Sequence, residues 1–332
     1  MATLSSKALT LADHAKRLDP DGKIPKIVEM LSQTNEILDD MLFLEGNLPT
    51  GHRQTIRTGL PDVYWRILNQ GVSPSKSATA QVDEHAGMLE AWSEVDKEIA
   101  ELNGNVNSFR LSEAQSFIEA MNQEMASTLF YGNASVSPEE FTGFAVRYSD
   151  LSAESGQNII DAGGSGSDNS SVYLVVWGEQ TCCGLFPKGS KAGLEHEDLG
   201  LVTIETTNGI AGQRLRAYQD RFHWKVGLSV KDWRYVVRIA NIDISNLVSK
   251  SSAADLIDLM IKAIHRIPNL NMGKACFYAN RSVIQMLDIQ RRDEVAGAGM
   301  RYEEVDGKLI PHFRGIPVKK CDSLTETEAR VV

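Results

Sequence analysis

The residue types that most often carry chemistry, histidine and cysteine, are scattered along this sequence. No two of its seven histidines stand four residues apart, and none forms a zinc-binding spacing with a cysteine. The run Glu195-His196-Glu197-Asp198 surrounds one histidine with acids, which is more typical of a solvated charged loop than of a ligand cluster. We therefore expect no metal site and no cofactor.

Motifs for covalent catalysis and nucleotide binding are incomplete. The stretch 163–167 (GGSGS) is similar to a hydrolase nucleophile elbow, but its final glycine is missing and a strand follows where that motif needs a helix. The segment 297–299 (GAG) does not complete a dinucleotide fingerprint, and no GxxxxGK[ST] loop is present. Cys182 and Cys183 lack a nearby cation that would activate a thiol. These absences favour a binding or structural role.

Length and composition describe an ordinary globular chain. The sequence has 332 residues, 42% of them hydrophobic and 23% charged, which suffices for two or three domains with buried cores. A net charge of −10 argues against a basic face that grips nucleic acid. No apolar run approaches a membrane span, the first residues show no secretory signal, and four cysteines predict reduced thiols in a cytosol-like compartment.

Hydrophobic periodicity predicts the elements that would position any site. One helix is expected from Asp21 to Gly46, and a second over 112–131, where Ser112-Glu113-Ala114-Gln115 has the pattern of a capping box. Strands are expected over 171–177, 201–206, 235–239, 276–279 and 309–319, and further helices over 252–267 and 281–290.

Residues 48–82 differ from the rest of the chain. They hold four basic residues and one acid, although the whole chain is acidic. Strand-like pieces at 54–58 and 63–68 lie between glycines and prolines, with too few apolar positions for a core of their own. The pattern predicts a long projecting hairpin that lies on another surface and buries Tyr64 and Trp65 there.

Two stretches resemble the major capsid proteins of tailed bacteriophages with the Hong Kong 97-type fold. In 277–287 (FYANRSVIQML) a strand is followed by an Asn-Arg that opens a helix, and 312–318 (HFRGIPV) supplies a Gly-x-Pro-Val strand, as in the axial domain of such coats. Residues 42–131 are similar to their extended loop and spine helix, most of all to those of short-tailed phages.

The resemblance implies an α+β capsid fold with an N-terminal arm and helix (1–47), an extended loop (48–92), a peripheral domain (93–250) with its spine helix at 112–131, and an axial domain (251–332). In such coats, a Gly-Asp/Glu turn and a long strand follow the Gly-x-Pro-Val element. Here similar sequence lies upstream, at 173–179 and 233–244. We therefore expect a permuted order of elements, with 171–245 outside the axial domain.

The function that the resemblance implies is that of a coat protein without enzymatic activity. It would self-assemble through hexamers and pentamers into the icosahedral shell of the virion, around double-stranded DNA held without sequence-specific contacts. Portal, scaffolding and decoration proteins are the implied partners, no membrane is involved, and assembly would take place in the host bacterial cytoplasm.

A coat subunit works through its surfaces, and the hairpin is the expected contact. We predict that Arg53, Arg57 and Arg66 pair with acids on the adjacent subunit and that Tyr64 and Trp65 are buried anchors there. The simpler alternative leaves these arginines facing solvent. The N-terminal arm is also expected to cross a neighbour.

Two other functions stay open from the sequence. One is a cytosolic hydrolase or oxidoreductase with a dispersed site around Cys182, Asp220 and His223. The other is a structural protein of a phage tail or baseplate. Large shells, as opposed to small oligomers or tubes, would separate the coat from both.

Overall fold

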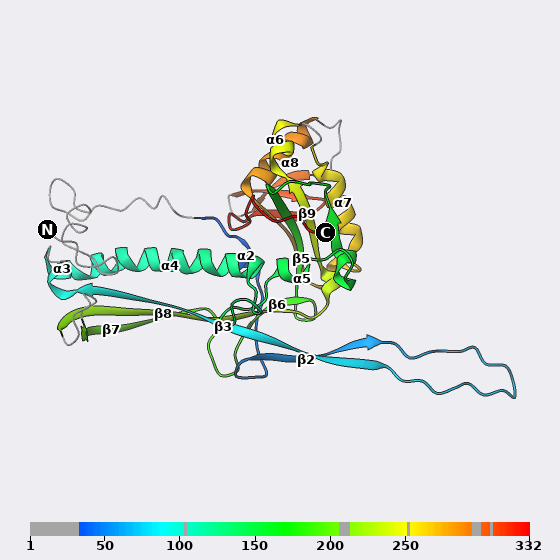
Figure 1. The fold of residues 1–332 in the computed structure, drawn as a ribbon, viewed down its shortest axis with the longest axis horizontal. Helices are drawn as coiled ribbons and strands as arrows, with labels where there is room; N and C mark the ends of the chain where they lie inside the picture. Colours follow the sequence, from blue (N-terminus) through cyan, green and yellow to red (C-terminus); the bar gives the residue numbers. More distant parts are fainter. Residues whose placement is uncertain (1–32, 103–104, 206–212, 251–252, 294–299, 306–307) are drawn as a thin grey trace.

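The computed structural model describes residues 33–102, 105–205, 213–250, 253–293, 300–305 and 308–332 of the chain. Figure 1 shows three parts: a compact body, a long limb that runs to one side of it, and a hairpin that projects to the other side. We use "body" for the described residues within 33–45, 141–186 and 231–332, "limb" for the described residues within 86–131 and 194–230, and "hairpin" for 51–85.

The body is built on a mixed sheet with the strand order β4, β9, β5, β10, β13, β12, β11. The strands are β4 (Ile159–Asp161), β5 (Asn169–Trp177), β9 (Val236–Asp243), β10 (Lys274–Ala279), β11 (Met300–Val305), β12 (Lys308–Phe313) and β13 (Ile316–Lys320). The pairs β4–β9 and β10–β13 are parallel, and the others in this order are antiparallel.

Every residue of β5 is buried, and its two sets of alternating side chains enter two different cores. Leu174 and its even-numbered neighbours pack with α7 (Leu256–Arg266) and α8 (Arg281–Asp293) on one face of the sheet. Tyr173 and its odd-numbered neighbours pack on the other face with the last turns of the long limb helix. β5 is therefore the central strand that joins the body to the limb.

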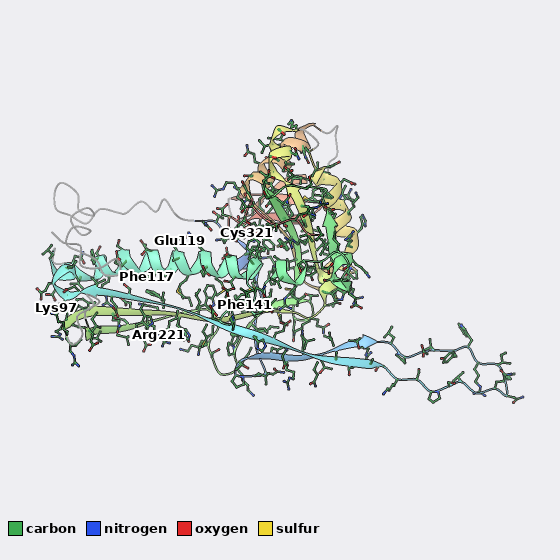
Figure 2. All side chains as sticks on the ribbon, viewed as in Figure 1. Lys97, Phe117, Glu119, Phe141, Arg221 and Cys321 are labelled. Carbon is green, nitrogen blue, oxygen red and sulfur yellow. The ribbon has the colours of Figure 1, made fainter. Side chains whose placement is uncertain are left out.

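The limb is a sheet of three long strands with one helix lying along it (Figures 1 and 2). Its elements are β3 (Ala78–Asp96), α3 (Lys97–Glu101), α4 (Val106–Tyr131), β7 (Leu194–Glu205) and β8 (Arg214–Val230). Phe117 of α4 stacks on Phe222 of β8, with 6.0 Å between ring centroids. None of the described helices has the length and apolar character needed to cross a membrane.

The hairpin consists of β2 (Gly51–Gly59) and the first part of β3, which pair in antiparallel fashion. Its far end, residues 60–77, is called the tip below. Shorter elements complete the described chain: α2 (Ile37–Asp40), β1 (Phe43–Glu45), α5 (Phe144–Arg147), β6 (Cys182–Phe186), α6 (Ile244–Ser249), and 3-10 helices at Glu154–Asn158, Trp233–Tyr235 and Leu270–Met272.

The helix predicted from residue 21 to 46 is wrong in its described part. Residues 21–32 lie outside the described residues, and the chain from 33 onward forms only the single-turn α2 before β1 pairs with β6. Ile37 and Met41 are buried, but against α4 and β5 rather than along a helical stripe. Tertiary packing and the pairing with β6 outweigh local helical propensity here.

The long helix α4 begins at Val106, six residues before its predicted start. Asn105 is its N-cap, and its side chain accepts a hydrogen bond from the backbone N–H of Ser108. The capping box predicted at 112–115 is therefore wrong, because Ser112 lies inside the helix. The added turns bury Phe109 against Val95 and Ala100, which explains why the helix extends to the earlier cap.

The expected permuted order of elements is also wrong. β5 hydrogen bonds with both β9 and β10, so segments at 169–177 and 236–243 share one sheet and one core with residues after 251. A boundary at residue 250 would cut through that core. The local sequence of a buried strand does not record its partner, and the partner is what assigns these strands to the body.

The strand predicted over 63–68 is wrong, whereas the one over 54–58 is confirmed as part of β2. In the described chain, pairing along the hairpin ends at Gly59 and Ala78. The tip beyond it forms a hydrogen-bonded turn in which the N–H of Gln70 donates to the carbonyl of Ile67, and Asn69 takes a left-handed conformation.

Candidate assembly interface

The hairpin is anchored firmly where it leaves the body. It begins at Gly51, which packs directly against the backbone of the opposite strand. A Cβ added at Gly51 would lie only 2.0 Å from the carbonyl oxygen of Glu84. The buried Glu84 carboxylate forms a two-pronged ion pair with Arg147 of α5, at 2.9 Å and 2.6 Å. The same guanidinium donates to the carbonyl of Leu228 in β8. Body, limb and hairpin therefore meet at one fixed junction.

Arg53 is paired within its own hairpin. Its Nε and Nη2 atoms donate to the two carboxylate oxygens of Asp83 at 2.6 Å and 2.7 Å. The hydrogen bonds from the guanidinium lower the pKa of the Asp83 carboxyl. The side chain of Asn47 donates one hydrogen bond to the backbone carbonyl of Arg53 and accepts another from its backbone N–H, each 2.7 Å long. In the described chain Arg53 thus stiffens the root of the hairpin.

The other four predicted contact residues lie on or near the tip and are exposed to solvent. Trp65 is 103% exposed and Tyr64 is 57% exposed, and Arg57 and Arg66 form no ion pair with any described residue. Leu60, Val63, Ile67 and Leu68 are between 69% and 89% exposed. So large an apolar surface in water is typical of an interaction site.

The residues proposed for a dispersed enzyme site do not come together. The Asp220 carboxylate accepts a hydrogen bond of 2.8 Å from Arg110 of α4, and it is also hydrogen bonded to His196 at 2.9 Å. Cys182 pairs in register with Val230, ten positions along β8 from Asp220, which is a separation of roughly 33 Å for an extended strand. Complete burial raises the pKa of the Cys182 thiol well above its ordinary value, so the thiol is not activated.

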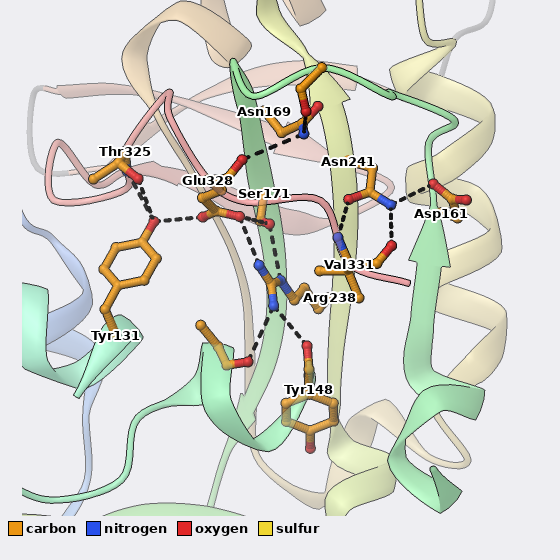
Figure 3. Close-up of polar contacts among 12 residues, drawn as sticks. Tyr131, Tyr148, Asp161, Asn169, Ser171, Arg238, Asn241, Thr325, Glu328 and Val331 are labelled. Carbon is orange, nitrogen blue, oxygen red and sulfur yellow. Dashed lines mark hydrogen bonds and ion pairs between the residues drawn. The ribbon is translucent and has the colours of Figure 1, made fainter. Parts of the chain in front are cut away.

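A buried polar cluster that the sequence did not predict holds the last residues of the chain in place (Figure 3). Arg238 of β9 and Glu328 form an ion pair of 2.8 Å, and each side chain is 4% exposed. Arg238 also donates to Ser171 at 3.0 Å and to the carbonyl of Tyr148 at 2.7 Å. Tyr131, the last residue of α4, donates to Glu328 at 2.6 Å. The cluster ties limb, body and C-terminal segment together.

A second buried carboxylate connects α2 to the body sheet. Asp40 accepts hydrogen bonds from Lys274 at 2.5 Å, Lys319 at 2.7 Å and Tyr278 at 2.8 Å. Burial by itself would raise the pKa of Asp40, but the hydrogen bonds from the two lysines and the tyrosine outweigh it, and the pKa is lowered.

The lowered pKa of Asp40 predicts a specific dependence of stability on pH. A carboxyl group with a depressed pKa in the folded state stabilises the fold fully above its unfolded pKa of about 3.9, and loses that contribution as the pH falls through the folded value. Asp40→Asn should therefore be less stable than the unchanged chain at pH 7, and this difference should shrink at pH 3. Urea unfolding of unassembled subunits measures both differences.

The exposed pair between Asp258 and Lys262 offers the control for this prediction. Asp258→Asn should change the free energy of unfolding at pH 7 by less than about 1 kcal/mol, because exposed pairs contribute little. An Asp40→Asn difference that is the same at both pH values would contradict the linkage.

A projecting hairpin, a long helix lying along an extended sheet and a separate compact body together define a capsid subunit of the Hong Kong 97-like fold. The chain belongs to the family described as major capsid protein GP7, whose sequence profile matches residues 19–332. It is therefore a bacteriophage coat protein that assembles with copies of itself into the virion shell.

Two solved structures contain chains that are similar to this one. A chain in the near-atomic resolution structure of bacteriophage Epsilon15 is 34% identical, with a TM-score of 0.79, over 100% of this chain and 99% of that one. A chain of the bacteriophage JBD30 capsid is 8% identical, with a TM-score of 0.47, over 89% and 93% of the two chains. No curated protein sequence matches this chain.

Proposed function

We propose that the hairpin is the clasp between neighbouring subunits in hexameric and pentameric rings. The observation that supports this is the tip, whose aromatic and aliphatic side chains are exposed although nothing in the described chain can cover them. Arg57 and Arg66 would pair with acids of the adjacent subunit, and Tyr64 and Trp65 would be the buried anchors. Arg53 supports the root of the hairpin through Asp83, and its contact with an acid of the adjacent subunit is proposed as well.

We further propose names for the parts of the subunit. The segment before residue 48 is the N-terminal arm, which reaches α4 where the N–H of Gln33 donates to Glu119 at 2.9 Å. The hairpin is the extended loop, the limb is the peripheral domain with α4 as its spine helix, and the body without residues 33–45 is the axial domain. This division keeps whole the hydrophobic cluster between the body sheet and helices α7 and α8.

Portal, scaffolding and decoration proteins are proposed as partners because the capsid family implies them, and assembly is proposed to take place in the bacterial cytoplasm. The chain's net charge of −10 supports packaged DNA held without specific contacts. We propose a structural and not a catalytic role, because the family that the chain belongs to is one of capsid proteins.

Imaging of the assembled chain tests the proposed clasp. The chain, expressed in bacteria and purified, should form closed shells in negative-stain micrographs, and a refined reconstruction should place the tip on a second subunit. Shells in which the tip contacts only its own subunit, or a product limited to one or two copies, would overturn the proposal.

A further inference from the structure

A pocket of about 250 Å³ lies where the limb meets the body, on the surface formed by β3, α4, β8 and the loop before α5. Its floor is apolar, with Leu89, Met125, Phe141 and Val226. Figure 2 labels Phe141 at this junction. A cavity of about 150 Å³ already holds a benzene ring, so this pocket has room for an indole.

The rim of the pocket is acidic. Glu124 of α4 and Glu139 are exposed, and Glu140 is half-buried beside them. Glu140 accepts a long hydrogen bond of 3.4 Å from the backbone of Asn133, and none of the three carboxylates forms an ion pair with a described residue. The pocket thus offers an apolar floor to a ring and three negative charges to the residues around it.

The tip has the complementary chemistry. Trp65 is its most exposed large side chain. Arg66 and Lys76 give the tip a positive charge opposed only by Asp62, and Arg57 lies just before it in β2. Its two sides are joined by a hydrogen bond that Ser75 donates to the carbonyl of Asp62 at 2.7 Å, which restrains the tip before it binds. A tip that is already ordered loses less conformational entropy when it binds.

The tip cannot reach the pocket of its own subunit. Along β3, the chain from Ala78 to Gly87 at the pocket is an extended segment of nine residue steps, or roughly 30 Å, and the tip lies beyond Ala78. Figure 1 shows this segment leading straight away from the limb. An occupant with the tip's chemistry must therefore come from another copy.

We infer that the pocket at the limb–body junction receives Trp65 from the hairpin tip of a neighbouring subunit, with Arg66 beside the acidic rim. The inference deepens the proposed clasp and rests on it: the clasp requires some second-copy surface, and the pocket is the surface that fits. Tryptophan and arginine are enriched among the residues that contribute most of the binding energy of protein interfaces.

Charge exchange tests the pairing. Glu124→Lys with Glu139→Lys should raise the concentration needed for shell assembly at least about tenfold, since like charges would then face the tip. Adding Arg66→Glu to that variant should recover much of the loss. The matched control is Glu98→Lys with Glu101→Lys on α3, far along the limb, which should leave assembly within about twofold.

Cross-linking tests the placement directly. A chain with Tyr64→Cys and Thr128→Cys, treated in assembled shells with a short bis-maleimide, should give a ladder of covalent multimers. Tyr64→Cys with Gln115→Cys should give none, because Gln115 lies 13 residues, or roughly 20 Å, further along α4. The four native cysteines are buried and leave the background low.

The outcomes separate this inference from the clasp itself. Shells of the unchanged chain that form normally, with no ladder from the Thr128→Cys pair and no effect of the Glu124 and Glu139 changes, would overturn the pocket and keep the clasp. The same result is expected if another protein fills the pocket. Failure of the unchanged chain to form shells would instead overturn the proposed clasp.

Discussion

Arg238→Met is expected to destabilise the subunit by about 3–5 kcal/mol, because it leaves the Glu328 carboxylate buried without its cation. Arg238 is also a donor to Ser171 and to the carbonyl of Tyr148, so the change removes these two hydrogen bonds as well. Urea unfolding of unassembled subunits, followed by circular dichroism, measures the free energy of unfolding.

Two further variants give this prediction its controls. Arg234→Met removes an exposed pair with Asp232 a few residues earlier and should cost less than about 1 kcal/mol. Arg238→Met combined with Glu328→Gln removes both buried charges and should be more stable than Arg238→Met alone. If Arg234→Met and Arg238→Met lowered the free energy of unfolding equally, burial of the Arg238–Glu328 pair would not determine its contribution to stability.

The second large effect concerns assembly and not folding. Replacing residues 61–76 by Asn-Gly, a dipeptide suited to a two-residue hairpin turn, should abolish shell formation. The free energy of unfolding should change by less than about 1 kcal/mol, because every residue from 61 to 76 is exposed and none belongs to a core cluster.

Sedimentation of the shortened chain measures the loss of shells, and thermal unfolding measures the fold. A full-length variant in which Ser73 and Ser77 are replaced by alanine is the control for mutagenesis of the tip, and it should assemble normally. Shells of the shortened chain at ordinary yield would contradict a role of the tip in assembly.

Local patterns predicted the elements whose signals lie within a few residues. The helices at 252–267 and 281–290 correspond to α7 and α8, since their apolar stripes and their ends are both local. The start of α4 was missed because Asn105 and Ser112 are both good N-caps, and only the distant contact of Phe109 with Val95 decides between them.

The pairing of side chains on the hairpin, in the pocket and in the buried polar cluster could not be predicted, because it depends on contacts between residues far apart in the sequence. Exposure and charge indicated the hairpin, but the pair of Arg53 with its cross-strand partner Asp83 was not predicted, because the two residues lie thirty positions apart. The pocket draws its lining from four separate segments, and the pair of Arg238 and Glu328 joins residues ninety positions apart. Such pairings follow from topology, which the strand sequences alone leave open.

The continuity of β3 has a mechanical consequence. One strand, Ala78–Asp96, passes from the hairpin into the limb, where it pairs with β8 from Ala86 to Asp96. Tension applied at the tip runs parallel to this strand, and its hydrogen bonds to β8 stand across the direction of pull. The hydrogen bonds between β3 and β8 are therefore loaded in shear and share the force. A shell that expands would have to break all of them at once to pull β3 out of the limb.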